Sequence, residues 1–360
     1  MPRPLSQQVV VITGASSGAG LATAQAAAAR GARVVMAARN ASDLEATAAA
    51  IRADGGDALA VPTDVTDAQA VEALAERAVE VYGRIDTWVN NAGVTAYARF
   101  QEQAADDFWE VMRVNVLGQV HGAKSALPHL ERTSGALICT GSVLSDLSVP
   151  TQAAYCASKH AVKGFVESLR IELAQAGSSV RVTLIRPASM NTPLFEKAKT
   201  QLGAVPQPLG PTYQPEVYAE VVLRAAQGDE RDAFVGGAGW GASLMARVSP
   251  TLVSAFVASP LATPPASDRP KSAGAPDNLY GPVDHDGGVR GLYSDRALAH
   301  SPYLALAGHS VETATVAAAA VGAGAGVAAR RGGGRTLPVL LGLAALAFVG
   351  KAVTSALTDR

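Results

Sequence analysis

Short apolar runs alternate along the chain with longer stretches whose apolar positions recur at helical spacing. The short runs are rich in Val, Ile and Leu and are predicted to be buried strands at residues 9–13, 33–37, 58–61, 85–89, 136–140, 180–185 and 233–235. The longer stretches predict helices at residues 21–30, 43–52, 68–82, 106–130, 153–175 and 215–227. Strict strand–helix alternation favours parallel pairing through right-handed crossovers, so the sequence predicts a doubly wound α/β sheet of seven strands.

A glycine-rich loop joins the first strand to the first helix, with Gly14, Gly18 and Gly20 in the run TGASSGAG. Glycine lets a backbone approach a pyrophosphate closely, and a helix amino terminus supplies free N–H groups with a partial positive charge. We therefore expect a dinucleotide to lie across this loop, including Ser16 and Ser17.

The end of the second strand indicates which dinucleotide is bound. An acidic residue about 20 positions after the glycines would accept hydrogen bonds from the ribose of NAD. Ala38 stands there instead, and Arg39 follows it. A guanidinium pairs with a 2′-phosphate, so NADP is favoured over NAD. The alternative is that Arg39 is a solvated charge at a strand end.

Tyr155 and Lys159 stand four residues apart on the predicted helix 153–175. Positions i and i+4 share one face of a helix, so the ammonium is expected to lie beside the phenol and favour its ionised form. A tyrosine placed in this way moves protons near neutral pH.

These motifs, with Ser142 thirteen residues before Tyr155, resemble the short-chain dehydrogenase/reductase family over about residues 9–237. The resemblance implies a Rossmann-like sheet of strand order 3-2-1-4-5-6-7 and a Tyr155 that exchanges the substrate proton. It further implies that Ser142 bonds the substrate oxygen and that Lys159 holds the nicotinamide ribose. Asn115 is implied to hold a water that connects the lysine to solvent.

Further cofactor contacts follow from the same resemblance. Asp64 is implied to accept from the adenine amino group, although a role as a helix cap or turn residue is an equal alternative. Asn90 is expected to support the sheet, and the following residues form the wall beside the cofactor. The remaining residues implied to contact the cofactor are Asn91, Ala92, Gly93, Tyr155, Lys159, Pro187, Met190 and Thr192, of which Met190 and Thr192 are implied to contact the nicotinamide carboxamide.

Residues 188–215 follow the sixth strand and are expected to form a lid over an apolar ketone or secondary alcohol. Their apolar side chains are Leu194, Phe195, Leu202, Val205, Leu209 and Tyr213. The alternative is that these side chains only pack the lid onto its own helices.

Composition narrows the class of protein. The 360 residues are 48% hydrophobic and 17% charged with a net charge of −1, which disfavours nucleic-acid binding. Cys139 and Cys156 form no Cys-x-x-Cys pair, no metal-ligand cluster stands out, and no cleavable signal peptide precedes Val9. A cytoplasmic catalytic domain over residues 1–240 is therefore expected, and the family resemblance implies a homodimer or homotetramer.

The rest of the chain has a different character. Residues 242–257 predict an apolar helix, and residues 259–302 are rich in Pro, Ser, Asp and Gly and predict an extended or disordered linker within a segment of 241–310. The tail, residues 311–360, carries an apolar stretch at 336–357 flanked by Arg330, Arg331 and Arg335. This stretch is a candidate anchor at the inner face of a membrane, and a peripheral or self-packing tail helix is the rival.

Three functions remain open at this point. The first is an NADP-dependent oxidoreductase. The second is a nucleotide-sensing interaction module without turnover, against which the intact Ser142, Tyr155 and Lys159 argue. The third is a related nucleotide-sugar epimerase, which the glycine spacing and the short lid disfavour.

Overall fold

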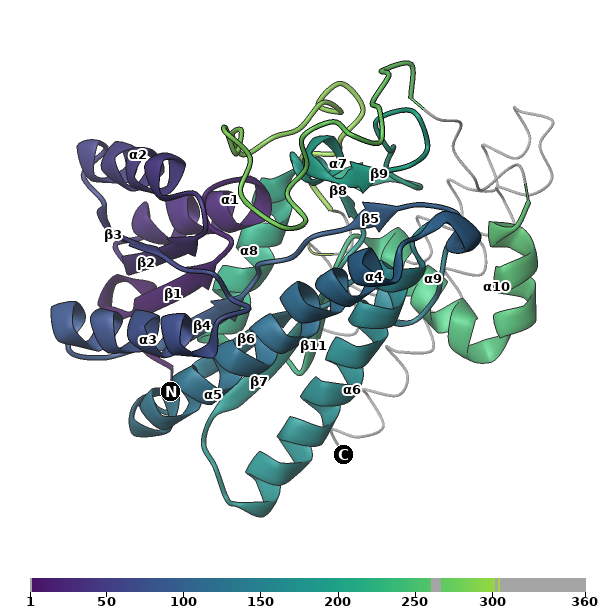
Figure 1. Ribbon diagram of the computed structural model, residues 1–360. Coiled ribbons are helices and arrows are strands. Elements are labelled where there is room, and N and C mark those ends of the chain that lie inside the picture. Colours follow the sequence, from purple (N-terminus) through teal and green to yellow (C-terminus); the bar gives the residue numbers. More distant parts are fainter. Residues whose placement is uncertain (1, 260–266, 302–303, 305–360) are drawn as a thin grey trace.

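A seven-stranded parallel sheet forms the centre of the molecule (Figure 1). The computed structural model describes residues 2–259, 267–301 and 304. Its strand order is β11-β7-β6-β4-β1-β2-β3, which in chain order is the predicted 3-2-1-4-5-6-7. The strands are β1 (Val9–Thr13), β2 (Arg33–Ala38), β3 (Asp57–Pro62), β4 (Thr87–Asn90), β6 (Ala136–Thr140), β7 (Arg181–Pro187) and β11 (Asp232–Val235). The prediction of a doubly wound parallel sheet is confirmed.

Helices cover both faces of the sheet (Figure 1). On one face lie α1 (Gly18–Ala28), α2 (Ala41–Ala53) and α8 (Pro215–Gln227). On the other lie α3 (Ala68–Tyr82), α4 (Ala105–Met112), α5 (Gly118–Thr133) and α6 (Ala153–Gln175). Successive side chains of a strand point to opposite faces, so Val10 packs into one core and Val11 into the other. Both cores bury their strand residues, which explains the unbroken apolar runs.

The predicted helix 106–130 is not one regular helix. A π-helical segment, Arg113–Leu117, separates α4 from α5. The segment widens the helix where the Asn115 side chain bonds the main chain of Val94. Such π segments occur often at functional sites, and hydropathy alone does not show them.

The predicted apolar helix 242–257 is also wrong as a single element. The chain forms α9 (Gly237–Val248) and α10 (Pro250–Val257), with Ser249 between them. Proline has no N–H to continue a helix but is favourable in a first turn, so Pro250 begins a new helix.

The predicted lid contains short regular elements. They are β8 (Ser189–Met190), α7 (Leu194–Lys197), β9 (Lys199–Thr200) and β10 (Thr212–Tyr213). β8 pairs with β10, and β9 pairs with β5 (Ala96–Tyr97). The β8–β10 pair closes the lid on itself, and the β5–β9 pair attaches the lid to the rest of the domain.

The segment predicted as a linker packs against the domain over residues 267–301. It has little regular structure, and it crosses above α1 and α7 in Figure 1. We call residues 278–288 the strap. Hydrogen bonds from Arg39 and Asn40 to strap carbonyls hold it in place, which a local sequence pattern does not reveal.

The candidate anchor at 336–357 lies outside the described residues, so membrane contact through the tail stays a prediction. Within the described part of the chain, no helix is long and apolar enough to cross a membrane.

Candidate active site

A cavity of about 1090 Å³ opens at the carboxyl ends of the strands. Ligands of open α/β sheets collect at this edge, where the strand order reverses. Most of the predicted site residues line this one cavity: Gly14, Ser16, Ser17, Gly18, Arg39, Asp64, Asn91, Ala92, Gly93, Ser142, Tyr155, Lys159, Pro187, Met190 and Thr192. Gly20 and Asn115 are not among its lining residues.

The glycine loop has a shape that side chains would disturb. Gly14 has φ +68°, and a Cβ there would lie 2.8 Å from the Ala92 Cα. A Cβ on Gly20 would lie 2.1 Å from the Gly14 carbonyl oxygen, so Gly20 serves the packing behind the loop. The Asn91 side chain donates to the Thr13 and Gly14 carbonyls at 2.9 and 3.2 Å. The braced loop leads into the amino terminus of α1, which fits the diphosphate of a dinucleotide.

The adenosine end of the groove contains Arg39 and Asp64. The Arg39 guanidinium donates to the main-chain oxygens of Asn278 and Leu279 at 2.5 and 3.5 Å. Asp64 accepts from the Thr66 N–H and hydroxyl, both at 2.9 Å. The turn role that the sequence left open for Asp64 is therefore present, while the residue also lines the cavity.

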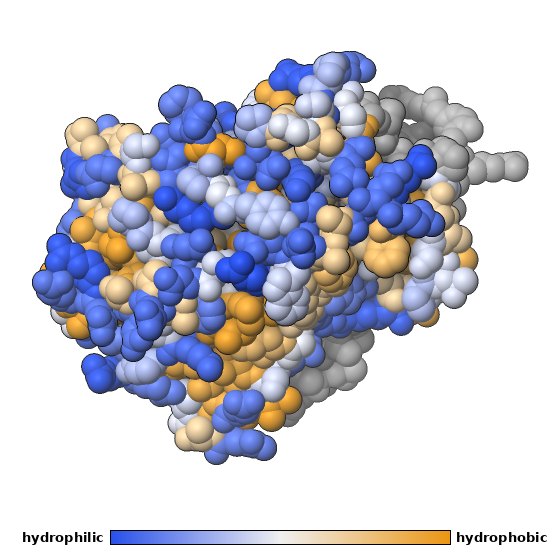
Figure 2. All heavy atoms as spheres, viewed as in Figure 1, coloured by the Kyte–Doolittle hydropathy of each residue, from blue (hydrophilic) through white to orange (hydrophobic). Residues whose placement is uncertain are grey.

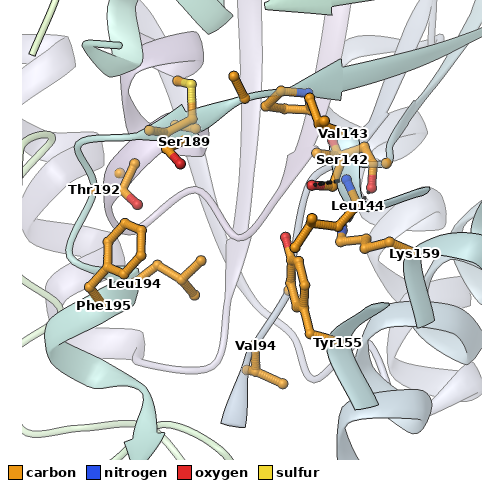
Figure 3. Close-up of a pocket in the computed structure, with 18 of the residues that line it drawn as sticks. Val94, Ser142, Val143, Leu144, Tyr155, Lys159, Ser189, Thr192, Leu194 and Phe195 are labelled. Atoms are coloured by element: carbon orange, nitrogen blue, oxygen red, sulfur yellow. Dashed lines mark hydrogen bonds between the residues drawn. The ribbon is translucent and has the colours of Figure 1, made fainter. Parts of the chain in front are cut away.

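Ser142, Tyr155 and Lys159 meet at one side of the cavity (Figure 3). Tyr155 and Lys159 lie one turn apart on α6, and the Lys159 Nζ is 5.4 Å from the Tyr155 ring centre. Ser142 follows the end of β6, and its Oγ accepts from the Leu144 N–H at 3.0 Å. Lys159 donates to the Thr140 carbonyl of the same strand at 2.9 Å.

Burial has the largest effect on the pKa values of Tyr155 and Lys159. It raises the pKa of Tyr155 to about 12, although a side-chain hydrogen bond with Ser142 lowers that pKa. Burial also lowers the pKa of Lys159 to about 8. The expectation of an ionised phenol is therefore not met: the phenol is neutral near pH 7, because loss of solvation outweighs its polar neighbours.

Asn115 lies behind the wall of the cavity and is fully buried. Its side chain accepts from the Val94 N–H at 2.9 Å and donates to the Val94 carbonyl and Ser158 hydroxyl, both at 3.0 Å. It thus fixes the chain after β4 against α6. The predicted water contact of Asn115 stays a prediction.

Comparison with known proteins identifies the family. The short chain dehydrogenase profile matches residues 8–203, more than half of the chain. The chain belongs to the short-chain dehydrogenase family. This result confirms the resemblance inferred from the motifs and makes the protein a member of a family of NAD(P)-binding oxidoreductases.

Individual relatives extend the match beyond residue 203. The uncharacterized oxidoreductase YxnA of Bacillus subtilis is 35% identical over 281 residues, which cover 77% of this chain and 79% of that protein. A short-chain dehydrogenase/reductase from Burkholderia phymatum in complex with NAD superimposes with a TM-score of 0.58 at 29% identity, covering 74% of this chain and 99% of the other. An alcohol dehydrogenase from Thermococcus sibiricus complexed with 5-hydroxy-NADP gives 0.56 at 28% identity, covering 63% and 95%.

Opposite Tyr155, the cavity of this short-chain dehydrogenase is lined mainly by apolar side chains. Leu194 and Phe195 of the lid face it in Figure 3. Elsewhere around the cavity, the apolar lining residues include Leu144, Leu147, Val149, Leu209, Met245, Leu252, Val253, Phe256 and Val257. Of the predicted lid residues, Leu202, Val205 and Tyr213 are not among the lining residues, and Tyr213 is buried against Gly236.

The sequence did not reveal three parts of the cavity wall. These are Lys197 at the end of α7, the helices α9 and α10, and the strap residues Asn278, Pro282 and Asp286. The site therefore extends past residue 240, where the predicted catalytic domain ends. Lys197 belongs to no sequence motif, and long-range contacts position the strap, so no local sequence pattern predicts either of them.

Proposed function

We propose that the protein transfers a hydride between NADP(H) and an apolar ketone or secondary alcohol, with Tyr155 as general acid and base. The observation that carries this proposal is the meeting of Tyr155, Ser142 and Lys159 in the cavity that also holds the glycine loop. Reactive hydroxyls beside a dinucleotide groove have the arrangement that a hydride transfer to carbonyl carbon needs.

The nicotinamide, when bound, supplies or accepts the hydride. In the reductive direction, the neutral Tyr155 phenol donates its proton to the forming alkoxide oxygen. Ser142 accepts from the Leu144 N–H and bonds the Tyr155 phenol, and its hydroxyl can turn from the phenol to bond the same substrate oxygen. Lys159, charged below its lowered pKa of about 8, places positive charge next to the phenol when the proton leaves.

The apolar lining supports an apolar substrate. Lid residues from α7 line the side of the cavity opposite Tyr155, and residues of α9 and α10 also line the cavity. A charged substrate would lose solvation there without a partner of opposite charge. The carbonyl is the polar part of the substrate, and Tyr155 and Ser142 are the groups that bond it.

The preference for NADP depends on Arg39. No carboxylate occupies the strand end at the buried Ala38, and Arg39 lines the cavity. Its guanidinium has five N–H donors, so its bonds to the two strap carbonyls leave donors for a phosphate. Affinities for NADPH and NADH in wild type and Arg39→Ala test this. We expect a loss of about tenfold or more for NADPH alone; equal losses for both would remove the preference.

Turnover tests the function as a whole. Purified full-length protein is mixed with NADPH, NADH and a panel of apolar ketones, and cofactor oxidation is followed. Oxidation that requires both a ketone and Tyr155 supports the proposal. Tight cofactor binding without turnover on any carbonyl would instead favour the nucleotide-sensing module.

We also propose a homodimer or homotetramer formed through α4, α5 and α6. Apolar residues gather on the surface over α5 and α6 in Figure 2. Trp109 of α4, Leu117 of the π-helical segment before α5 and Ile171 of α6 are exposed by 62%, 40% and 59%. Apolar patches of this kind mark protein–protein contacts, and a two-fold axis lets one patch pair with itself.

A further inference from the structure

A lysine of the lid lies directly over the glycine loop. Lys197, at the end of α7, donates from Nζ to the Ser17 hydroxyl at 2.7 Å. The same Nζ lies 3.1 Å from the Asp286 Oδ1 and 3.1 Å from the Asp286 carbonyl oxygen. Lys197, Ser17 and Asp286 all line the cavity, and the lysine side chain is 13% exposed.

The position of this cation is unfavourable without an anion. Ser17 is the N-cap of α1, so the ammonium lies at the positive end of a helix. Ser17 makes no side-chain bond to the helix N–H groups and instead accepts from Lys197. A negative group between the ammonium and the positive end of the helix stabilises both.

The strap supplies the negative groups in this structure. Asp286 pairs with Lys197, and the Gly288 carbonyl accepts from the Gly18 N–H at 3.0 Å. The Asp286 carboxylate thus accepts from the Lys197 ammonium, and the Gly288 carbonyl accepts from the Gly18 N–H of the loop. A diphosphate offers the same kind of acceptors with more charge.

We propose that Lys197 binds the diphosphate of the dinucleotide and that Asp286 is its competing counter-ion when no cofactor is present. This inference rests on the function proposed above. On binding, the ammonium exchanges the Asp286 carboxylate for a phosphate oxygen. Asp286 then opposes cofactor binding, because it holds the cation and repels the phosphates.

The strap keeps its place during this exchange through contacts elsewhere. Arg39 and Asn40 donate to the Asn278 and Val283 carbonyls at 2.5 and 3.0 Å. The Tyr280 hydroxyl donates to Asp107 at 2.7 Å. The strap is therefore an outer wall of the groove, and the Lys197–Asp286 pair and the Gly18–Gly288 bond are the contacts that change partner.

The experiment measures Kd for NADPH and NADH by titration calorimetry in wild type, Lys197→Met, Lys197→Arg and Asp286→Asn. Lys197→Met is expected to weaken both dinucleotides by about tenfold or more, since a charge-assisted bond to the shared diphosphate is lost. Lys197→Arg keeps the cation and is expected to stay within about threefold of wild type. Asp286→Asn is expected to tighten both by roughly threefold or more, since it removes a competing charge.

Lys197→Met and Asp286→Asn are expected to change Kd in opposite directions, and this difference distinguishes the proposal from a purely structural role. If Lys197 and Asp286 only fasten the strap, both substitutions loosen it and shift Kd in the same direction, which would overturn the proposal. Lys124→Met is the control: Lys124 is exposed on α5 and is not among the cavity-lining residues. Its variant is expected to bind both dinucleotides as wild type does.

Two further outcomes are decisive. If wild type binds dinucleotide and neither Lys197→Met nor Asp286→Asn changes Kd, the role of Lys197 is wrong while the proposed function stands. If wild type binds no dinucleotide, the proposed function fails and this inference fails with it. If thermal unfolding shows that Lys197→Met does not fold, the Kd values of Asp286→Asn and Lys197→Arg still test whether Asp286 opposes cofactor binding.

Discussion

The ammonium of Lys159 lies 5.4 Å from the centre of the Tyr155 ring and donates to the main-chain carbonyl of Thr140. Both side chains leave the same face of α6, as their spacing of four residues predicts. The carbonyl at the end of β6 holds the lysine between the helix and the sheet. The structure thus brings the aromatic hydroxyl and the cation into one buried space at the strand ends.

Replacing the phenol removes its proton without changing the ring. We expect Tyr155→Phe to lower kcat by about 10²- to 10⁴-fold, the usual contribution of a general acid. Its Kd for NADPH is expected to change little. Steady-state kinetics with the best ketone of the panel and cofactor titration measure the two effects. Tyr82→Phe, which alters a hydroxyl bonded to Asp57 outside the cavity, is the control; turnover that survives in Tyr155→Phe would refute the mechanism.

The sequence predicted the reactive residues better than the walls around them. Tyr155, Lys159 and the glycines had local signals, because a helix turn and a strand–loop–helix junction fix their geometry over a few residues. Lys197 and Asp286 meet across 89 residues of sequence separation. No periodicity links them, and the Pro- and Gly-rich strap has no regular structure of its own to predict.

The predictions that were wrong also have physical explanations. The π-helical segment around Asn115 depends on hydrogen bonds to Val94 on a distant loop. The raised pKa of Tyr155 depends on burial, which the sequence alone did not supply. By contrast, the strands were found nearly to the residue, because both faces of the sheet are covered and every strand position of β1 is buried.

Lys159 is expected to cost the protein stability. Burial lowers its pKa from the ordinary 10.5 to about 8, so the unfolded chain binds this proton more tightly than the folded one. The penalty is complete below about pH 8 and disappears as the pH rises towards 10.5. This penalty amounts to a few kcal/mol. The hydrogen bond to the Thr140 carbonyl offsets about 1 kcal/mol of it.

Lys159→Met is therefore predicted to raise Tm at pH 7 while abolishing turnover. The difference in Tm from wild type is expected to shrink as the pH rises from 8 to 10.5. Thermal unfolding at several pH values checks this, and Lys124→Met serves as a control outside the cavity. A lower Tm for Lys159→Met at pH 7 would contradict the stated cost of the buried cation.

Asp146 holds together the elements next to Ser142. Its buried carboxylate lies 2.6 Å from the Lys163 Nζ of α6 and 2.8 Å from the Arg186 guanidinium of β7. Burial raises the pKa of Asp146, but the bonds and charges of Lys163 and Arg186 outweigh it and hold that pKa at about 2. Because this pKa is depressed, the stabilisation is full above the ordinary 3.8 and is lost as the pH falls to about 2.

Asp146→Asn removes the carboxylate that pairs with Lys163, Arg186 and Arg247, although Arg186 keeps its pair with Asp232. We expect it to lower the free energy of unfolding by about 3 kcal/mol or more at pH 7. Urea unfolding measures the change, and the gap from wild type should close between about pH 4 and pH 2. Glu80→Gln disrupts an exposed pair with Arg77 and should have an effect below about 1 kcal/mol. Equal effects of the two substitutions would show that the Asp146 cluster has no special role.

A charge at an exposed apolar residue of α6 tests the proposed assembly. Ile171 is 59% exposed on α6, and in a two-fold interface each copy would bury it against its partner. Ile171→Glu then places two carboxylates in that interface without a counter-charge, so light scattering should show a smaller molecular mass than for wild type. Val81→Glu, at a residue 42% exposed on α3, is the matched control and should keep the wild-type mass. If only Val81→Glu lowers the mass, the subunits associate through α3 rather than through α4, α5 and α6.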